Sequence, residues 1–101
     1  MARAEGRIAF KVEEGPDSTV VGFELDDPIS PEDLRAIKPP TVDPKTGVIL
    51  SGRGPIWLYA FLVHHYHPTK WIAICDPRLG AVVVQSHDPS KRVGDVIGMR
   101  T

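Results

Sequence analysis

The sequence predicts one small α/β domain with a mixed sheet and two helices, and three observations carry this prediction. The chain has 101 residues, which is the length of a single domain. Strand-like segments alternate with two helix-like segments in the order strand, strand, helix, strand, helix, strand, strand, strand. The strands at 48–50 and 71–76 are apolar almost throughout, as parallel strands buried on both faces are. The β-α-β-α-β middle therefore implies right-handed crossovers, in a Rossmann-like fold or in its nearest competitor, a ferredoxin-like sheet.

The first two predicted strands lie in the segment 7–25 and are joined by the loop Glu13–Asp17. In each arm an apolar residue occupies every second position, which is the pattern of a half-buried strand. These positions are Ile8, Phe10 and Val12 in the first arm and Val21, Phe23 and Leu25 in the second.

The next segment carries the signals of a short helix. Ser30 is suited to the N-cap, Pro31 to the first helical position, and Asp33 to closing a capping box. Pro39 and Pro40 end the helix, because a residue before proline is held out of the helical conformation.

The second helix is predicted to begin at Pro55 and to end near Tyr66, because Pro68 holds the residue before it in an extended conformation. Its residues are apolar almost all round, which is typical of helices buried on more than one side. In so small a domain, one side is expected to face the sheet and another side a second subunit.

The remaining elements are strands and the turns between them. Residues 71–76 (WIAICD) form a buried strand, PRLG turns the chain, residues 81–87 form the next strand, and residues 96–99 a short last one. A single domain is therefore expected over residues 1–101, with a frayed end at residues 1–6.

The composition indicates which partners and which cellular compartment fit the protein. The formal net charge is -1, so no global basic field favours a long nucleic-acid duplex as partner, whereas a small anion held by a few local arginines fits. The single cysteine, Cys75, excludes an internal disulfide and fits a reducing cytoplasm. The sequence shows neither a signal peptide nor an apolar run of about 18 residues, so no membrane partner is expected.

Two polar segments, Ser51–Gly54 and Asp76–Arg78, each follow a predicted parallel strand. In open α/β sheets, ligands bind outside the carboxyl ends of the parallel strands. Four side chains are therefore expected to converge on one edge of the sheet: Ser51, Arg53, Asp76 and Arg78.

The glycine corner at this edge has the features of a phosphate site. Gly52 and Gly54 allow close backbone approach, and the helix that follows offers free N–H groups and a positive dipole end. It is not a P-loop, because no Gly-Lys-Ser/Thr follows. The same pattern also fits a simple helix entrance with two solvated arginines.

Histidines are expected at the other end of the second helix. His64 lies on an apolar helical face, which suggests a core or interface position, and His65 is expected in solvent. The helix spans about 15 Å at 1.5 Å per residue. His67, just past the helix, and His87, at the end of a returning strand, should therefore lie at the opposite pole from Arg53. One chain cannot bring both sets together, whereas head-to-tail stacking of subunits would.

Two literal strings resemble a known family. They are GVILSGRGPIWLYAFLVHHYHPT, from Gly47, and DPRLGAVVVQSH, up to His87. Both resemble the CRISPR-associated Csx-three family, the small ring nucleases of type III CRISPR systems. The strong match covers about two-fifths of the chain, and the first half agrees more loosely through Pro28, PEDL and PTVD. The chain departs from the family at Pro68, where relatives can carry a second histidine, which bears on any metal site using that position.

The resemblance implies a prokaryotic, cytoplasmic enzyme that cleaves cyclic tetra-adenylate and thereby switches off the antiviral response. It implies a dimer related to the CRISPR-associated Rossmann fold, with the ligand held between two dimers stacked head to tail. It implies catalysis by His67, Asp76 and Arg78, with His67 delivered by the opposing dimer as general acid or base. Ligand binding is implied for Ser51, Gly52, Arg53, Gly54, Arg78 and His87.

The resemblance also leaves two alternatives open. Manganese-dependent removal of adenylates from RNA 3′ ends is attributed to the family, so short oligoadenylate RNA is a second candidate ligand. Manganese is then the candidate cofactor, with Asp76, His67 and His87 as its implied ligands. The other alternative is a module that binds cyclic oligoadenylate without cutting it.

Overall fold

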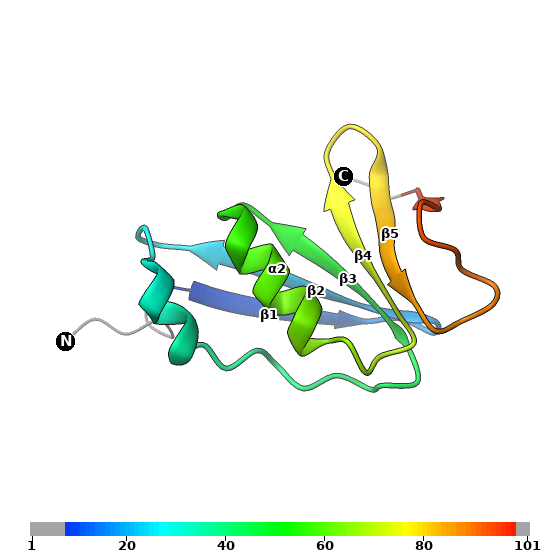
Figure 1. The fold of residues 1–101 in the computed structure, drawn as a ribbon, viewed down its shortest axis with the longest axis horizontal. Coiled ribbons are helices and arrows are strands. Elements are labelled where there is room, and N and C mark those ends of the chain that lie inside the picture. Colours follow the sequence, from blue (N-terminus) through cyan, green and yellow to red (C-terminus); the bar gives the residue numbers. More distant parts are fainter. Residues whose placement is uncertain (1–7, 99–101) are drawn as a thin grey trace.

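A six-stranded mixed sheet and one α-helix form the part of the chain that the computed structural model describes, residues 8–98 (Figure 1). The strands lie side by side in sequence order, from β1 to β6. In chain order the elements are β1 (Ile8–Glu14), β2 (Ser18–Leu25), η1 (Pro31–Arg35), β3 (Gly47–Gly52), α2 (Ile56–His65), β4 (Trp71–Asp76), β5 (Gly80–Ser86) and β6 (Val96–Ile97).

The parallel centre of the sheet agrees with the prediction. β3 pairs in parallel with both β2 and β4, and antiparallel strands flank this centre on both sides. The Rossmann-like and ferredoxin-like assignments are not confirmed. Residues of η1 and α2 pack into one core on the same face of the sheet, and no strand is inserted between the parallel neighbours. The observed fold is a small α/β domain with one α-helix.

The first predicted helix is wrong in type, because it is a five-residue 3-10 turn. Its start agrees with the prediction: the N–H of Ser30 donates to Oδ2 of Asp33 at 2.8 Å. Between Pro31 and Pro39 few residues can form the i to i+4 bonds of an α-helix, so only the tighter turn forms. The last strand is also shorter than predicted, ending at Ile97. Met99 and the predicted frayed residues 1–6 lie outside the described residues.

The sheet has a core on each face, but the cores cover different strands. On one face α2 places Leu58 and Leu62 against Val21, Leu50 and Ile72, and all five side chains are fully buried. The second core lies on the opposite face, mainly over β4 and β5; its buried members are Ile49, Trp71, Ala73, Ala81 and Val83. No helix of the described chain covers this opposite face over β1 and β2, where alternate side chains are exposed.

Helix α2 buries only part of its apolar surface. Leu58 and Leu62 face the core, whereas Ile56 is 85% exposed and Ala60 is exposed as well. His64 is also exposed, so of the two positions expected for it the core is wrong, and the interface stays a prediction. No helix among residues 8–98 combines the length and the apolar character needed to cross a bilayer.

Tyr66 joins the end of α2 to the loop before β3 and generates a testable prediction. Its ring is 3% exposed and its hydroxyl donates to the carbonyl of Pro40. Burial raises the pKa of Tyr66 to about 12 from 10.0. Because the folded chain favours the neutral phenol, this contribution to stability is complete below pH 10 and is lost as the pH rises through about 12.

We therefore expect the free energy of unfolding to fall by about 2 kcal/mol more in the wild type than in Tyr66→Phe between pH 10 and pH 12. At pH 7 the variant should be less stable by about 1 kcal/mol, because one hydrogen bond is lost. Urea unfolding followed by circular dichroism at several pH values measures both quantities. Parallel pH profiles for the two proteins would contradict the prediction.

Candidate functional site

The glycine corner between β3 and α2 is shaped by packing. A Cβ at Gly52 would lie 2.4 Å from the carbonyl oxygen of Phe23, and one at Gly54 would lie 3.0 Å from Leu58 and 3.1 Å from the Phe23 ring. The hydroxyl of Tyr59 donates to the carbonyl of Gly52, and its ring packs edge-on against Phe23 at 5.2 Å between centroids. The close approach of β2 therefore explains Gly52 without a ligand, and the Leu58 and Phe23 side chains leave little room for a side chain at Gly54.

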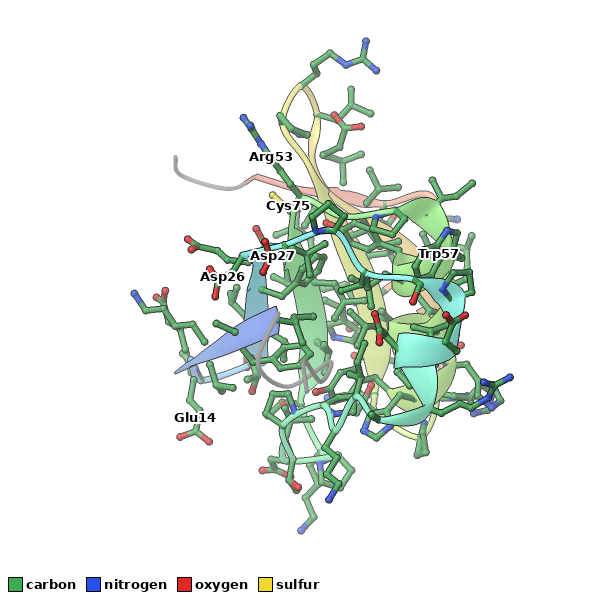
Figure 2. All side chains as sticks on the ribbon, turned by 90° about the vertical axis from the view of Figure 1, so that its left-hand side faces the viewer. Glu14, Asp26, Asp27, Arg53, Trp57 and Cys75 are labelled. Atoms are coloured by element: carbon green, nitrogen blue, oxygen red, sulfur yellow. The ribbon has the colours of Figure 1, made fainter. Side chains whose placement is uncertain are left out.

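The corner nevertheless presents groups that attract an anion. Arg53 is exposed, and among residues 8–98 its side chain has no hydrogen bond or ion pair. Ile56 and Trp57 begin α2, where backbone N–H groups have no carbonyl one turn earlier to accept them. Figure 2 shows Arg53 projecting outward, away from Trp57. These are unpaired donors at a positive helix end.

The end of β4 adds a second arginine to the same edge. Leu50 pairs with Ile74 in parallel, which places the residues after both strands at one edge of the sheet. Asp76 holds the turn there: its Oδ1 accepts the N–H groups of Arg78 at 2.8 Å and Leu79 at 3.2 Å. The Nε of Arg78 lies 4.0 Å from the same oxygen, and its side chain is 90% exposed. The structure thus leaves Arg78 projecting from a turn that Asp76 positions.

The turn closes because of Gly80, whose φ of 113° places it in the left-handed region. A side chain there would also meet the carbonyl of Ile97 at 2.6 Å. Three residues separate Asp76 from Gly80, so the glycine ends a short hairpin loop in the way such loops require. The carboxylates of Asp26 and Asp27 follow the neighbouring β2 and add negative charge beside this edge.

His67 and His87 meet at the opposite end of the sheet. Their ring centroids are 5.2 Å apart, and the Nε2 of His87 lies 3.2 Å from the backbone carbonyl of His67. Gln85 donates to the same carbonyl at 2.9 Å. Since a carbonyl only accepts, the contact selects the tautomer of His87 that carries its proton on Nε2. Two side chains from the end of β5 therefore hold the backbone of His67.

Within one chain, His67 and His87 lie at the opposite end of the sheet from Arg53 and Arg78. Trp71 pairs with Ser86 at the histidine end of β4, and Asp76 pairs with Gly80 at the other end. The first and last of the six residues of β4 are five steps of about 3.3 Å apart, or about 17 Å. This separation agrees with the two poles expected from strand polarity.

The implied manganese ligands do not meet within one chain. Asp76 lies at the far end of β4 from His67 and His87, and residues 8–98 contain no cluster of three metal-ligating side chains. The carboxylate next to His87 is Asp88, which is already engaged. Its pKa is lowered mainly by the N–H of Ser90, and Lys70 lies 3.6 Å away. A complete metal site would therefore need donors from a second chain.

Sequence reasoning missed two residues that position the site, Tyr59 and Gln85. Each acts through a hydrogen bond to a backbone carbonyl, at Gly52 and at His67. Burial raises the pKa of Tyr59, so its hydroxyl stays a donor. Both residues lie within the two strings that resemble the family, but the strings do not reveal their role, because the carbonyl that each one meets is set by packing and strand register.

Comparison with known proteins identifies the family. Residues 22–98, which include the corner, the Asp76 turn and both histidines, match the family described as CRISPR-associated protein (Cas_csx3). The chain belongs to the Cas_csx3 family. This confirms the family expected from the two strings and gives the protein a CRISPR-associated role. A protein of Aquifex aeolicus (strain VF5), described as an uncharacterized protein, is 60% identical over 86 residues, which are 80% of this chain and 78% of that protein.

The two hydrogen bonds to the His67 carbonyl generate a prediction for this Cas_csx3 protein. Gln85→Leu removes one of the two donors to the His67 carbonyl. We expect the turn between α2 and β4 to open about 5-fold more often, because a lost hydrogen bond costs about 1 kcal/mol. Hydrogen exchange at the Thr69 and Lys70 amides measures this opening.

The neighbouring exposed residue offers the control. Val84→Thr changes an exposed side chain of the same strand and should leave exchange at both amides unchanged. Equal exchange rates in Gln85→Leu and Val84→Thr would show that Gln85 does not hold the turn.

Proposed function

We propose that this protein is a ring nuclease, which cleaves cyclic tetra-adenylate to linear oligoadenylate and so ends type III CRISPR antiviral signalling. Membership in the Cas_csx3 family supports a CRISPR-associated role. The observation that carries the proposal is that the arginines and the histidine pair lie at opposite ends of one sheet. Arg53 and Arg78 lie at one end without strong anionic partners, and His67 and His87 meet at the other.

The reaction suits these side chains. A ribose 2′-hydroxyl attacks the adjacent phosphorus in line and expels the 5′-oxygen, leaving a 2′,3′-cyclic phosphate and a 5′-hydroxyl. A base takes the proton of the attacking hydroxyl, and an acid returns one to the leaving oxygen. Histidine is the side chain that changes charge near neutral pH, so His67 takes this role. Arg53 and Arg78 bind the phosphate and stabilise the charge that develops on its oxygens.

The active site is shared between molecules. A separation of about 17 Å along β4 keeps His67 of one chain from a phosphate held by its own Arg53. Head-to-tail stacking of two dimers brings the histidine end of one onto the arginine end of the other. The exposed apolar side of α2, with Ile56 and Ala60, supports pairing of chains within each dimer.

Complementation tests the shared site. Arg53→Ala lacks the phosphate donor and His67→Ala lacks the acid-base group, so each should lose at least about 100-fold in single-turnover cleavage of cyclic tetra-adenylate. Equimolar mixing should restore part of the activity, because some interfaces then pair an intact Arg53 with an intact His67. Product analysis by chromatography, with and without manganese, measures the recovery.

Controls separate the outcomes of this mixing experiment. Lys38→Gln changes an exposed side chain of the crossover between η1 and β3, outside the residues assigned to either end, and should cleave at the wild-type rate. No recovery at any mixing ratio would overturn the shared site. Wild-type protein that binds the ring and leaves it intact would favour a binding module. Cleavage restricted to linear oligoadenylate with manganese would favour the 3′-end exonuclease.

A further inference from the structure

A hollow of about 700 Å³ lies beside the arginine end, within the size range of roughly 300–1,000 Å³ typical of small-molecule sites. Its lining includes Arg53 and Ser51 together with residues of β1 and β2. Phe10, Phe23 and Leu25 of the same strands pack into the α2 core, so their alternate neighbours face the opposite side of the sheet. The hollow thus opens on the helix-free face of β1, β2 and β3.

Strand register arranges the lining in two rows. Lys11 pairs with Gly22, and Gly22 pairs with Ser51, which makes one row across three strands. In the next row Ala9 pairs with Glu24, and Arg53 follows the β3 residue that pairs with Phe23. Small residues form the floor of the hollow, and charged side chains stand at its rim.

Gly22 is the residue that the fold does not explain. It lies in the interior of β2, where glycine weakens a strand. Its φ is not positive, and a Cβ there would meet only ordinary contacts, at 3.6 Å from the Lys11 carbonyl and 3.7 Å from the Ser51 carbonyl. Gly52, in contrast, has no room for a side chain. The strand therefore tolerates a side chain at Gly22, and its absence keeps the sheet surface bare.

The rim charges are available to a ligand. Among residues 8–98 the side chains of Lys11, Glu24 and Arg53 form no hydrogen bond or ion pair. Lys11 offers a donor and Glu24 an acceptor on either side of the bare floor, and Arg53 offers a forked donor for a phosphate.

We propose that this hollow binds one nucleotide unit of the oligoadenylate, with its base lying flat on the peptide surface around Gly22. This inference rests on the proposed function for the identity of the ligand. An adenine base presents an amine, which donates to the Glu24 carboxylate, and ring nitrogens, which accept from Lys11. The phosphate lies toward Ser51 and Arg53. Lys11, Gly22 and Glu24 are thus specificity-determining residues that the corner motif does not include.

Gly22→Val tests the proposal, because it fills the floor without a clash. The variant should fold with an equal or higher melting temperature, since a β-branched residue replaces glycine in a strand. Its affinity for cyclic tetra-adenylate should fall at least 10-fold, measured by titration calorimetry. Gly98→Val is the matched control, because Gly98 lies after β6 and outside the hollow, and a Cβ there has no atom within 4 Å.

Lys11→Met keeps the proposal testable if Gly22→Val fails to fold, and should weaken binding at least 5-fold with an unchanged melting temperature. If the wild type binds the ring and both variants bind with the wild-type Kd, the hollow is not a subsite, and the proposed function stands.

If the wild type does not bind the ring, the proposed function fails, and AMP becomes the probe. AMP that shifts the NMR signals of the Gly22 and Ser51 amides in the wild type, with no binding to Gly22→Val, would still support the hollow. No shift with AMP would overturn it.

Discussion

The contact between the Phe23 ring and Gly52 is the constraint on which the arginine end of the molecule depends. Phe23 is 3% exposed, and the backbone of β3 approaches it so closely that no side chain fits at Gly52. The same ring packs on Tyr59, whose hydroxyl holds the Gly52 carbonyl. β2, β3 and α2 thus contact one another at this point, and Arg53 is the residue that follows it in the chain. Its position is determined by apolar packing, since close-packed interiors transmit small displacements.

The sequence predicted those parts of the fold that local signals determine. Alternation in residues 8–25, the apolar run 71–76, and the prolines at both ends of α2 each mark an element by its own residues. The structure of the crossover between β2 and β3 was harder to predict. Ser30 and Asp33 signal a helix start, but the length of that helix depends on Pro39, Pro40 and on how far the chain must travel to reach β3. The path that the chain must take to β3 therefore outweighed the local preference for an α-helix.

Part of the candidate site was equally predictable. Parallel strands end at the same edge of a sheet, so the meeting of the corner with the Asp76 turn, and the separation of both from His67, followed from strand polarity. Gln85 could not be found in this way. A register shift between Ile72 and Ala73 changes which β5 residues face them, and sequence gives no sign of that shift. Nor does sequence distinguish a glycine required by packing, such as Gly52, from one that leaves a surface bare, such as Gly22.

The hydrogen bond from His87 to the His67 carbonyl has a consequence for the geometry of the histidine end. The bond uses Nε2–H, which is present both in the selected neutral tautomer and in the imidazolium ion. A proton gained or lost at Nδ1 therefore changes the charge of His87 without removing its contact to the turn. The backbone that carries His67 keeps its anchor in both charge states, so the placement of the His67 ring does not depend on the charge of His87.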